Sequence, residues 1–159
     1  MPPFPTQPTH LLHQIMQSYP NCLILRLRMP VSDDLHPRSF VTKITRYAHV
    51  VDIPNSTTML HDLVPVAVAL AEHGETGVYN FCNPGAISHN EVLGLYRDIV
   101  DPAVVKAGRS NCELDPEKLV RKCREFGIRV PEVKEAYRAC FERMKRGMEM
   151  QQKAGAQGL

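Results

Sequence analysis

The sequence predicts an α/β fold with a parallel sheet, and three observations lead to that class. Residues 22–29 and 77–82 are mostly apolar, rich in β-forming side chains and bounded by turn residues, which is typical of buried strands. The segments around them repeat apolar residues at a spacing of three and four, which indicates amphipathic helices. Strands that alternate with helices in this way favour parallel pairing of 22–29 with 77–82.

A pair of parallel strands has free edges, so we expect it to be the end of a larger sheet. In open α/β sheets, ligands bind just beyond the carboxyl ends of the strands. The loop that follows residues 22–29 holds Ser32, Asp33 and Asp34. We therefore expect a ligand to be bound near that loop.

The elements before the second strand follow from local patterns. Residues 1–8 hold four prolines and are expected to be a disordered lead-in. A short amphipathic helix is predicted over 9–18, and Pro30 is predicted to end the first strand and open a polar loop. A second short helix is predicted over 38–47, and a brief strand over 50–53.

The segment between the two strands is predicted to be a buried helix over residues 62–73. It is composed almost entirely of Val, Ala and Leu, with Asp62 as the expected N-cap and Gly74 just past its end. After the second strand, Ser88 and Glu91 stand at the spacing of a capping box, which opens a further helix.

Two more helices complete the predicted domain, which covers residues 9–150. Asp115 and Pro116 begin the first of them, and Gly127 ends it. Pro131 opens the second and longest, whose apolar stripe of Met and aromatic residues is interpreted as a core face rather than a cofactor site. Residues 151–159 are small and polar, and we expect them to form a frayed tail.

Composition excludes several classes of protein. The chain of 159 residues fits one domain, and 43% hydrophobic with 23% charged residues is typical of a globular protein. A formal charge of +2 without a basic block argues against nucleic-acid binding. No apolar run could cross a bilayer, and the proline-rich start is unlike a secretory signal. A cytoplasmic protein without a membrane partner is expected.

The cysteines do not indicate a metal site or a disulfide framework. All five are scattered without a Cys-x-x-Cys pair or a His at zinc-like spacing. We interpret them as buried thiols, and no metal is predicted. The positions are Cys22, Cys82, Cys112, Cys123 and Cys140.

The common nucleotide and hydrolase motifs are missing from these residues. The sequence has no Gly-x-Gly-x-x-Gly and no Gly-x-x-x-x-Gly-Lys-Ser/Thr, so it contains no self-sufficient phosphate-binding loop. No serine stands in a Gly-x-Ser-x-Gly elbow, which leaves an unrelated hydrolase as a distant alternative. Asp33 and Asp34 are adjacent and would point apart in an extended loop, so we interpret them as turn-stabilising rather than as an acid/base pair.

Three other polar positions have both a functional and a structural interpretation. His61 beside Asp62 could be a tuned base, although Asp62 is more simply an N-cap. His89 lies in the first turn of its helix and is interpreted as a surface residue. Arg109, in a polar loop, suits recognition of a phosphate or carboxylate, with a structural ion pair as the equal alternative.

A series of segments, in order along the chain, matches one family. The matched segments are residues 25–35, 37–44, 51–56, 79–85, 88–91, 109–111 and 114–115. Together they resemble the C-terminal part of nucleotide-rhamnose synthase, the 3,5-epimerase/4-reductase of UDP-L-rhamnose synthesis, and more widely the dTDP-4-dehydrorhamnose reductases of the extended short-chain dehydrogenase/reductases.

The resemblance implies a fold and a set of site residues. The chain would be the C-terminal portion of a Rossmann-like fold, contributing the last two parallel strands and a helical substrate-binding region. NADPH or NADH would be the cofactor, and a UDP- or dTDP-linked 4-keto-6-deoxy sugar the substrate. The residues implied in substrate binding are Pro30, Val31, Ser32, Asn83 and Arg109, and those implied in cofactor binding are Met29 and Pro30.

One departure from the family pattern bears on activity. The family's glycine-rich loop and its catalytic Tyr-x-x-x-Lys pair match nothing in these residues, because no tyrosine has a lysine four positions later. No catalytic residue is therefore assigned. We expect a substrate-binding part that is incomplete and inactive alone, completed by an N-terminal half or a homologous subunit. The alternative is a non-catalytic, reductase-like regulatory or interaction subunit.

Overall fold

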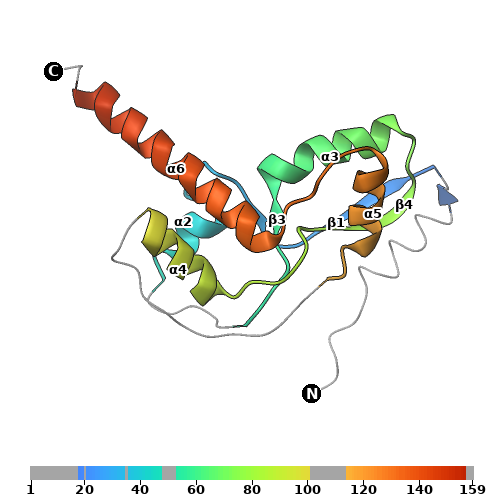
Figure 1. The fold of residues 1–159 in the computed structure, drawn as a ribbon, viewed down its shortest axis with the longest axis horizontal. Helices are drawn as coiled ribbons and strands as arrows, with labels where there is room; N and C mark the ends of the chain where they lie inside the picture. Colours follow the sequence, from blue (N-terminus) through green and yellow to red (C-terminus); the bar gives the residue numbers. More distant parts are fainter. Residues whose placement is uncertain (1–17, 20, 35, 48–52, 101–113, 157–159) are drawn as a thin grey trace.

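The computed structural model describes residues 18–19, 21–34, 36–47, 53–100 and 114–156, which form an α/β arrangement (Figure 1). Strands β1 (Leu23–Leu27) and β4 (Gly77–Phe81) lie side by side and run parallel. In their register Leu23 pairs with Gly77 and Leu27 with Phe81. The parallel pairing predicted from the sequence is confirmed. The predicted segments 1–8 and 50–52, and all but the last residue of the predicted helix over 9–18, lie outside the described residues.

The sequence predicted a polar loop after β1, but the structure has a short strand there. Pro30 and Val31 form a two-residue strand, β2, which pairs in parallel with β3 (Thr58–Met59). The prediction that Pro30 ends the first strand was wrong, because β1 ends at Leu27 and Pro30 itself begins β2, which continues the chain into a second small sheet. Proline is tolerated as the first residue of such a short strand, since it lacks only the backbone donor. A bridge between Asn55 and Ile87 adds an antiparallel contact nearby. These pairings hold the start of the predicted ligand loop against the rest of the fold.

Helix α3 (Leu60–Glu72) connects β3 to β4 and packs on the β1–β4 sheet. It begins two residues earlier than predicted, so the expected N-cap was wrong. Met59 occupies the cap position and makes no side-chain cap, while Asp62 lies in the first turn. Gly74 follows the helix with a φ of 67°, a left-handed conformation that costs glycine little and confirms the predicted end.

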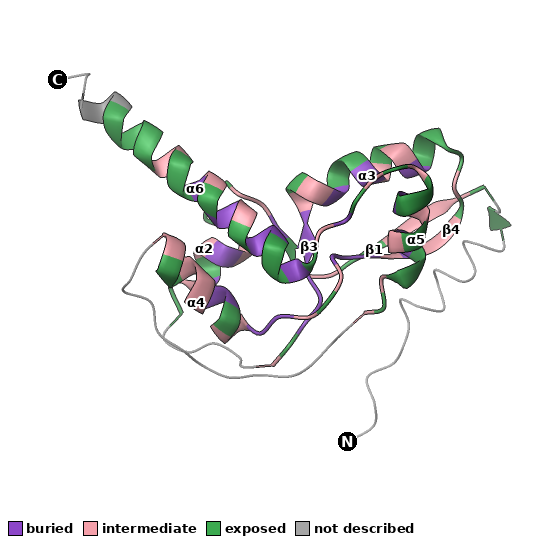
Figure 2. Cartoon of the chain, viewed as in Figure 1, coloured by how far each residue is buried: buried purple, intermediate pink, exposed green. Residues whose placement is uncertain are grey.

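The helices pack into two hydrophobic clusters. Figure 2 shows the buried residues of the chain in purple. The first cluster joins the β1–β4 sheet, α3 and α5 (Glu117–Glu125), with Leu63, Tyr79 and Leu119 almost fully buried. The second joins β2 and β3 to α2 (Phe40–Ile44), α4 (His89–Ile99) and α6 (Val133–Ala156). The two short sheets therefore belong to different cores.

The start of α4 and the end of α5 agree with the sequence patterns, whereas α2 covers only residues 40–44 of the predicted 38–47 and α6 extends beyond its predicted end. The capping box of Ser88 and Glu91 is present at the start of α4, and Gly127, with a φ of 72°, follows α5. Helix α6 begins at Val133, and its helical conformation continues through Ala156, so residues 151–156 are helical where a frayed tail was expected. Its C-terminal half projects away from the remaining elements (Figure 1). No helix of the described segments is both long enough and apolar enough to cross a membrane.

A band of buried polar residues ties the two sheets together. It contains Asn55, Ser56, Thr57 and Thr58, each at most 2% exposed, and Asn83, which is fully buried. The Thr58 hydroxyl donates to the Phe81 carbonyl at 2.6 Å. Because buried polar groups are costly unless they are bonded, these contacts fix the positions of the strands.

Asn83, directly after β4, connects this band to two other segments. Its Oδ1 accepts from the Met59 backbone N–H at 2.9 Å, and its Nδ2 donates to the Pro131 carbonyl at 3.1 Å. Its own backbone N–H donates to the Thr57 carbonyl at 2.9 Å. One side chain thus joins the end of β4 to β3 and to the segment that leads into α6.

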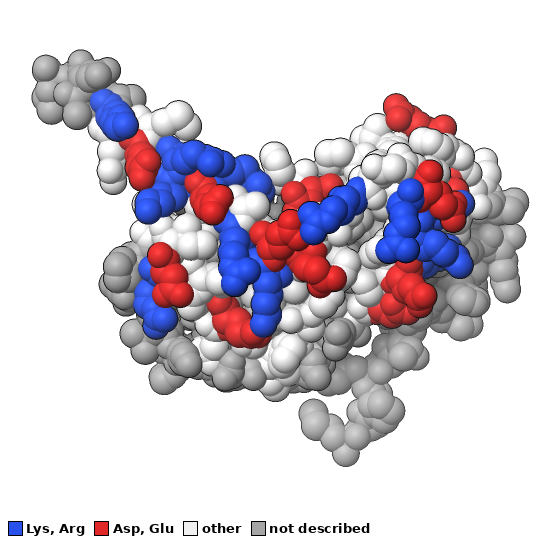
Figure 3. Space-filling model, viewed as in Figure 1, with Lys and Arg blue, Asp and Glu red and all other residues white. Residues whose placement is uncertain are grey.

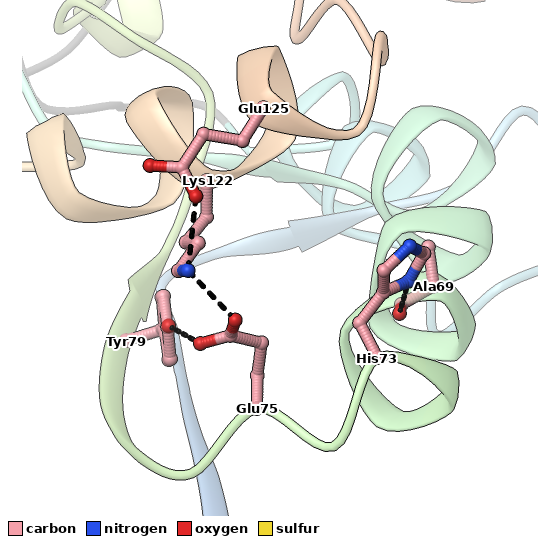
Figure 4. A network of polar contacts seen from close by, with 6 residues as sticks. All are labelled: Ala69, His73, Glu75, Tyr79, Lys122 and Glu125. Atoms are coloured by element: carbon pink, nitrogen blue, oxygen red, sulfur yellow. Dashed lines mark hydrogen bonds and ion pairs between the residues drawn. The ribbon is translucent and has the colours of Figure 1, made fainter.

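A second polar network fixes α5 against the turn before β4 (Figure 4). Lys122 lies 2.8 Å from Glu75 and 2.9 Å from Glu125, and the Tyr79 hydroxyl donates to Glu75 at 2.6 Å. Burial, followed by this hydrogen bond to Glu75, raises the pKa of Tyr79 to about 12. On the face shown in Figure 3, basic and acidic side chains lie interleaved, as they do in this network.

We predict that Asn83→Ala lowers the free energy of unfolding by about 2–4 kcal/mol, because it leaves the Met59 N–H and the Pro131 carbonyl buried without partners. Chemical denaturation followed by circular dichroism measures the loss. Asn80→Ala is the matched control, since the bonds of Asn80 to Arg26 and Asp115 are exposed, and it should cost at most about 1 kcal/mol. Equal losses in the two variants would contradict the structural role of Asn83.

Candidate functional site

The candidate site lies at the carboxyl ends of β1 and β4, where residues 29–33 leave the sheet. Met29 stands between β1 and β2 with a φ of 40°, which non-glycine residues seldom adopt. Such strain persists only where surrounding contacts hold it, and it is concentrated at functional sites. The contacts are present here, because the Arg28 carbonyl accepts from Thr58 N–H at 2.8 Å and Pro30 pairs with Thr58.

The sequence-predicted residues of this segment differ in their exposure. Pro30 is exposed and Met29 and Ser32 are partly buried, so all three have surface to offer a ligand. The Val31 side chain is 1% exposed and belongs to the core formed with α6, which leaves its backbone for any ligand contact. The Ser32 carbonyl accepts a weak hydrogen bond from the Cys140 thiol, with Sγ at 3.7 Å.

Asn83 is fully buried in the polar band beside this segment and has no surface to offer a ligand. Both ends of its amide are occupied by backbone groups of the protein, so the described chain uses it to hold the site together. Arg109, the remaining predicted substrate-binding residue, lies outside the described residues. Ser56 fixes Leu114, which follows that segment, through a hydrogen bond of 2.7 Å from the Leu114 N–H to the Ser56 hydroxyl.

The structure brings Asp33 to a basic residue that the sequence did not pair with it. Arg143 of α6 donates from Nε to Asp33 Oδ2, and His61 Nδ1 lies 3.8 Å from the same oxygen. Burial alone would raise the pKa of Asp33, but the hydrogen bond and the charge of Arg143 outweigh it and hold the pKa below its ordinary value. Asp34 accepts from the His36 N–H and stabilises the turn, as predicted.

Asp62 has a different environment from Asp33 although both stand near Arg143. Its Oδ2 is buried and has no hydrogen-bond partner among the described residues. Burial raises the pKa of Asp62, and the nearby charges of Arg143 and His61 oppose that effect. The pKa values of the two carboxyl groups are thus shifted in opposite directions. The alternative in which His61 is a base tuned by Asp62 is not supported by a hydrogen bond between these two residues. His61 is instead an exposed neighbour of Asp33.

Other chemistry is limited in the described part of the chain. It contains no cluster of three or more His, Cys, Asp or Glu side chains that could hold a metal ion. The described cysteines are free thiols; Cys82, Cys123 and Cys140 are buried and Cys22 is partly buried. A separate groove of about 630 Å³ runs between α5 and the segment 127–132 that precedes α6, lined by Pro84, Val120, Arg124 and other residues, and it contains none of the predicted site residues.

Sequence reasoning missed the polar residues that support the site. The run from Asn55 to Thr58 was visible as four polar residues directly before a buried helix, a pattern that is costly unless each side chain is bonded. No role was predicted for Arg28 either, although a charged residue at the end of an apolar strand is unusual. Either signal could have indicated a polar layer under the ligand loop.

We predict that Arg143→Met destabilises the fold by about 1–2 kcal/mol at neutral pH, because it leaves the Asp33 carboxylate partly buried without its cation. The folded-state pKa of Asp33 is lowered, so its contribution is present above the unfolded value of 3.8 and is lost as the pH falls through the folded value. The difference from the unmodified chain should therefore vanish in acid. Arg138→Met, an exposed change on the same helix, is the control, and a pH-independent loss would contradict this account.

Comparisons with known proteins identify relatives of this chain. A bifunctional dTDP-4-dehydrorhamnose 3,5-epimerase/dTDP-4-dehydrorhamnose reductase of Arabidopsis thaliana is 47% identical over 123 residues, covering 69% of this chain and 41% of the relative. A trifunctional UDP-glucose 4,6-dehydratase/UDP-4-keto-6-deoxy-D-glucose 3,5-epimerase/UDP-4-keto-L-rhamnose reductase of the same plant is 41% identical over 142 residues, covering 80% and 21%. No protein-family model matches the chain.

A solved structure agrees with these relatives. The crystal structure of the L780 UDP-rhamnose synthase from Acanthamoeba polyphaga mimivirus matches with a TM-score of 0.72 and 35% identity, covering 82% of this chain and 49% of that one. The chain thus spans less than half the length of the curated relatives it matches. The relatives and the solved structure together show that the chain is homologous to part of these nucleotide-rhamnose synthases and dTDP-4-dehydrorhamnose reductases.

Proposed function

We propose that the chain is the substrate-binding part of a nucleotide-sugar epimerase/reductase that makes UDP-L-rhamnose or dTDP-L-rhamnose. In this proposal it is the C-terminal portion of a Rossmann-like extended short-chain dehydrogenase/reductase and acts in the cytoplasm. The observation that carries the proposal is the strained, firmly held segment 29–32 at the carboxyl ends of the parallel strands. Relatives whose names include the epimerase and reductase steps support the choice of reaction.

The reaction assigns separate roles to the parts of the site. Epimerisation of a 4-keto sugar next to its ketone, followed by hydride delivery to that ketone, requires a nicotinamide and a sugar held in one fixed arrangement. Met29 and Pro30 are proposed to lie beside the nicotinamide of NADPH or NADH. Pro30, Val31 and Ser32 are proposed to contact the sugar, with Asn83 supporting them from below and Arg109 binding the nucleotide sugar.

We further propose that these residues alone bind the nucleotide sugar without reducing it. The printed sequence has no Tyr-x-x-x-Lys pair to protonate the ketone oxygen and no glycine-rich loop to hold the cofactor diphosphate. Both are supplied, in this proposal, by another polypeptide segment that extends the sheet beyond β1. The edge of β1 opposite β4 has no strand partner among the described residues.

A second candidate function is a non-catalytic, reductase-like regulatory or interaction subunit. Apolar surface favours it, because Leu27 of β1 is 48% exposed and Val64 and Val68, one turn apart on α3, are 52% and 54% exposed. Large exposed apolar side chains and a free strand edge are each typical of sites where another chain docks.

We expect the purified chain to bind NADPH more weakly than micromolar and to leave it unoxidised when UDP-4-keto-6-deoxyglucose is added. Calorimetry measures the affinity, and the absorbance of reduced nicotinamide measures turnover, with folding checked by circular dichroism. A full-length rhamnose synthase serves as the positive control. Turnover by the folded chain would show that it contains its own catalytic groups and would overturn the proposal of an incomplete enzyme.

For the interaction subunit, we expect a stable partner to copurify from native extract and to be lost in Leu27→Lys, because a lysine on a strand edge opposes further pairing. Lys118→Ala, a polar change in α5 away from the β1 edge, is the control. A chain that elutes as a clean monomer from extract, with Leu27→Lys behaving identically, would count against this second candidate.

A further inference from the structure

Arg28 occupies the last position before the strained Met29 and is held there on its backbone. Its N–H donates to the Thr58 hydroxyl at 3.1 Å, and its carbonyl accepts from the Thr58 N–H at 2.8 Å. Since Thr58 is fully buried and also bonded to Phe81, the Arg28 main chain is fixed from β3 and β4 together. The side chain therefore starts from a rigid point at the carboxyl end of β1.

The guanidinium group is also held, but only by a neutral partner. Its Nη2 donates to Asn55 Oδ1 at 3.1 Å. Asn55 is 2% exposed and cannot swing away, because its Nδ2 donates to the Ile53 carbonyl and its backbone bridges to Ile87. The Arg28 Nε is buried and has no hydrogen-bond acceptor among the described residues.

Arg28 has no carboxylate partner among the described residues, and in this it differs from Arg143. Arg28 and Arg143 are partly buried, whereas the other described arginines are exposed. Arg143 is paired with the carboxylate of Asp33, whereas none of the ion pairs formed by described residues includes Arg28. Withdrawing a cation from water without an anion costs free energy, and an anionic ligand would offset that cost.

We propose that Arg28 binds a phosphate oxygen of the nucleotide sugar, with Asn55 as the residue that orients its guanidinium. This inference rests on the proposed function and deepens it by adding a binding residue to segment 29–32. The planar guanidinium presents several donors in a fixed fork, which matches phosphate geometry. Diphosphates occur in both the nucleotide sugar and the nicotinamide cofactor, so the test separates these two sources.

Ligand-detected NMR titrations of the full 159-residue chain test the assignment with UDP, dTDP and NADPH as probes and uridine as the uncharged control. We expect Arg28→Met to weaken binding of UDP or dTDP about ten- to a hundredfold, the usual range for loss of a charged hydrogen bond. Uridine binding should not change. Methionine retains most of the apolar stem of arginine, which favours retention of the fold, and thermal unfolding checks this.

Arg26→Met is the matched control. Arg26 lies two residues earlier in β1 and bonds to Asn80 at the surface, so its loss should change nucleotide affinity less than about twofold. Asn55→Asp is the second variant, which decides the matter if Arg28→Met fails to fold. It places a carboxylate against Arg28, where we expect an ion pair with the guanidinium. Because that ion pair competes with the phosphate, nucleotide affinity should also fall.

The possible results separate this inference from the proposed function. Nucleotide binding that survives both Arg28→Met and Asn55→Asp would overturn the role of Arg28 and leave the proposed function standing. A loss of NADPH binding with unchanged UDP and dTDP binding would assign Arg28 to the cofactor and overturn the substrate assignment. A folded, unmodified chain that binds neither UDP nor dTDP would overturn both proposals.

Discussion

The need to satisfy the buried polar stretch Asn55–Thr58 governs this structure. Each of these residues lies inside the fold, where an unbonded polar group costs about 1–3 kcal/mol. Thr58 meets that requirement by bonding to both Arg28 and Phe81, and Ser56 meets it by bonding to Leu114. The stretch therefore connects β1, β4 and the segment before α5. The Thr57 hydroxyl is the exception in this stretch, because it makes no hydrogen bond of normal geometry in the described chain and instead lies close to the Tyr137 hydroxyl of α6.

This arrangement explains how a small sheet can hold residues 29–32, the candidate ligand segment, in a rigid position. The β1–β4 pair alone is a short sheet, and its core belongs to α3 and α5. Residues 30–31 leave that sheet and join a different core, formed with α6. The chain thus passes from one core to the other within residues 25–31, with Leu25 packed against the first core and Val31 buried in the second. Anchoring of this kind is what a site needs in order to hold a sugar and a cofactor in fixed relation.

The charged groups around this segment have distinct roles because their surroundings differ. Asp33 is held ionised by Arg143 and joins the ligand segment to α6. Asp62, in the first turn of α3, is partly buried, and its Oδ2 accepts no hydrogen bond in the described chain. Burial raises its pKa. Arg28 faces a neutral amide instead of a carboxylate. Of these three, Arg28 has a charge that the described chain leaves for a ligand to meet.

Patterns that act over a few residues were predictable from the sequence. The parallel partners 22–29 and 77–82, the capping box of Ser88 and Glu91, and the glycine ends of α3 and α5 were all expected, because each depends on local periodicity or on backbone chemistry. The family was also recognisable from its ordered segments. The start of α3 was misplaced because Asp62 is a good cap by type, while the pairing of β2 with β3 decided where the helix begins.

The sequence by itself determined the fold class, the main strands, most helices and the family, since these follow from hydrophobic pattern and turn chemistry. Tertiary structure alone decided which polar groups meet. Asp33 and Arg143 are 110 positions apart, and Asn83 and Pro131 are 48 apart, so no local pattern could pair them. It also decided that Val31 and Asn83 are buried while Pro30 is exposed. The physical reason is that burial and hydrogen-bond partners depend on how distant segments pack, and packing is fixed only when the whole chain has folded.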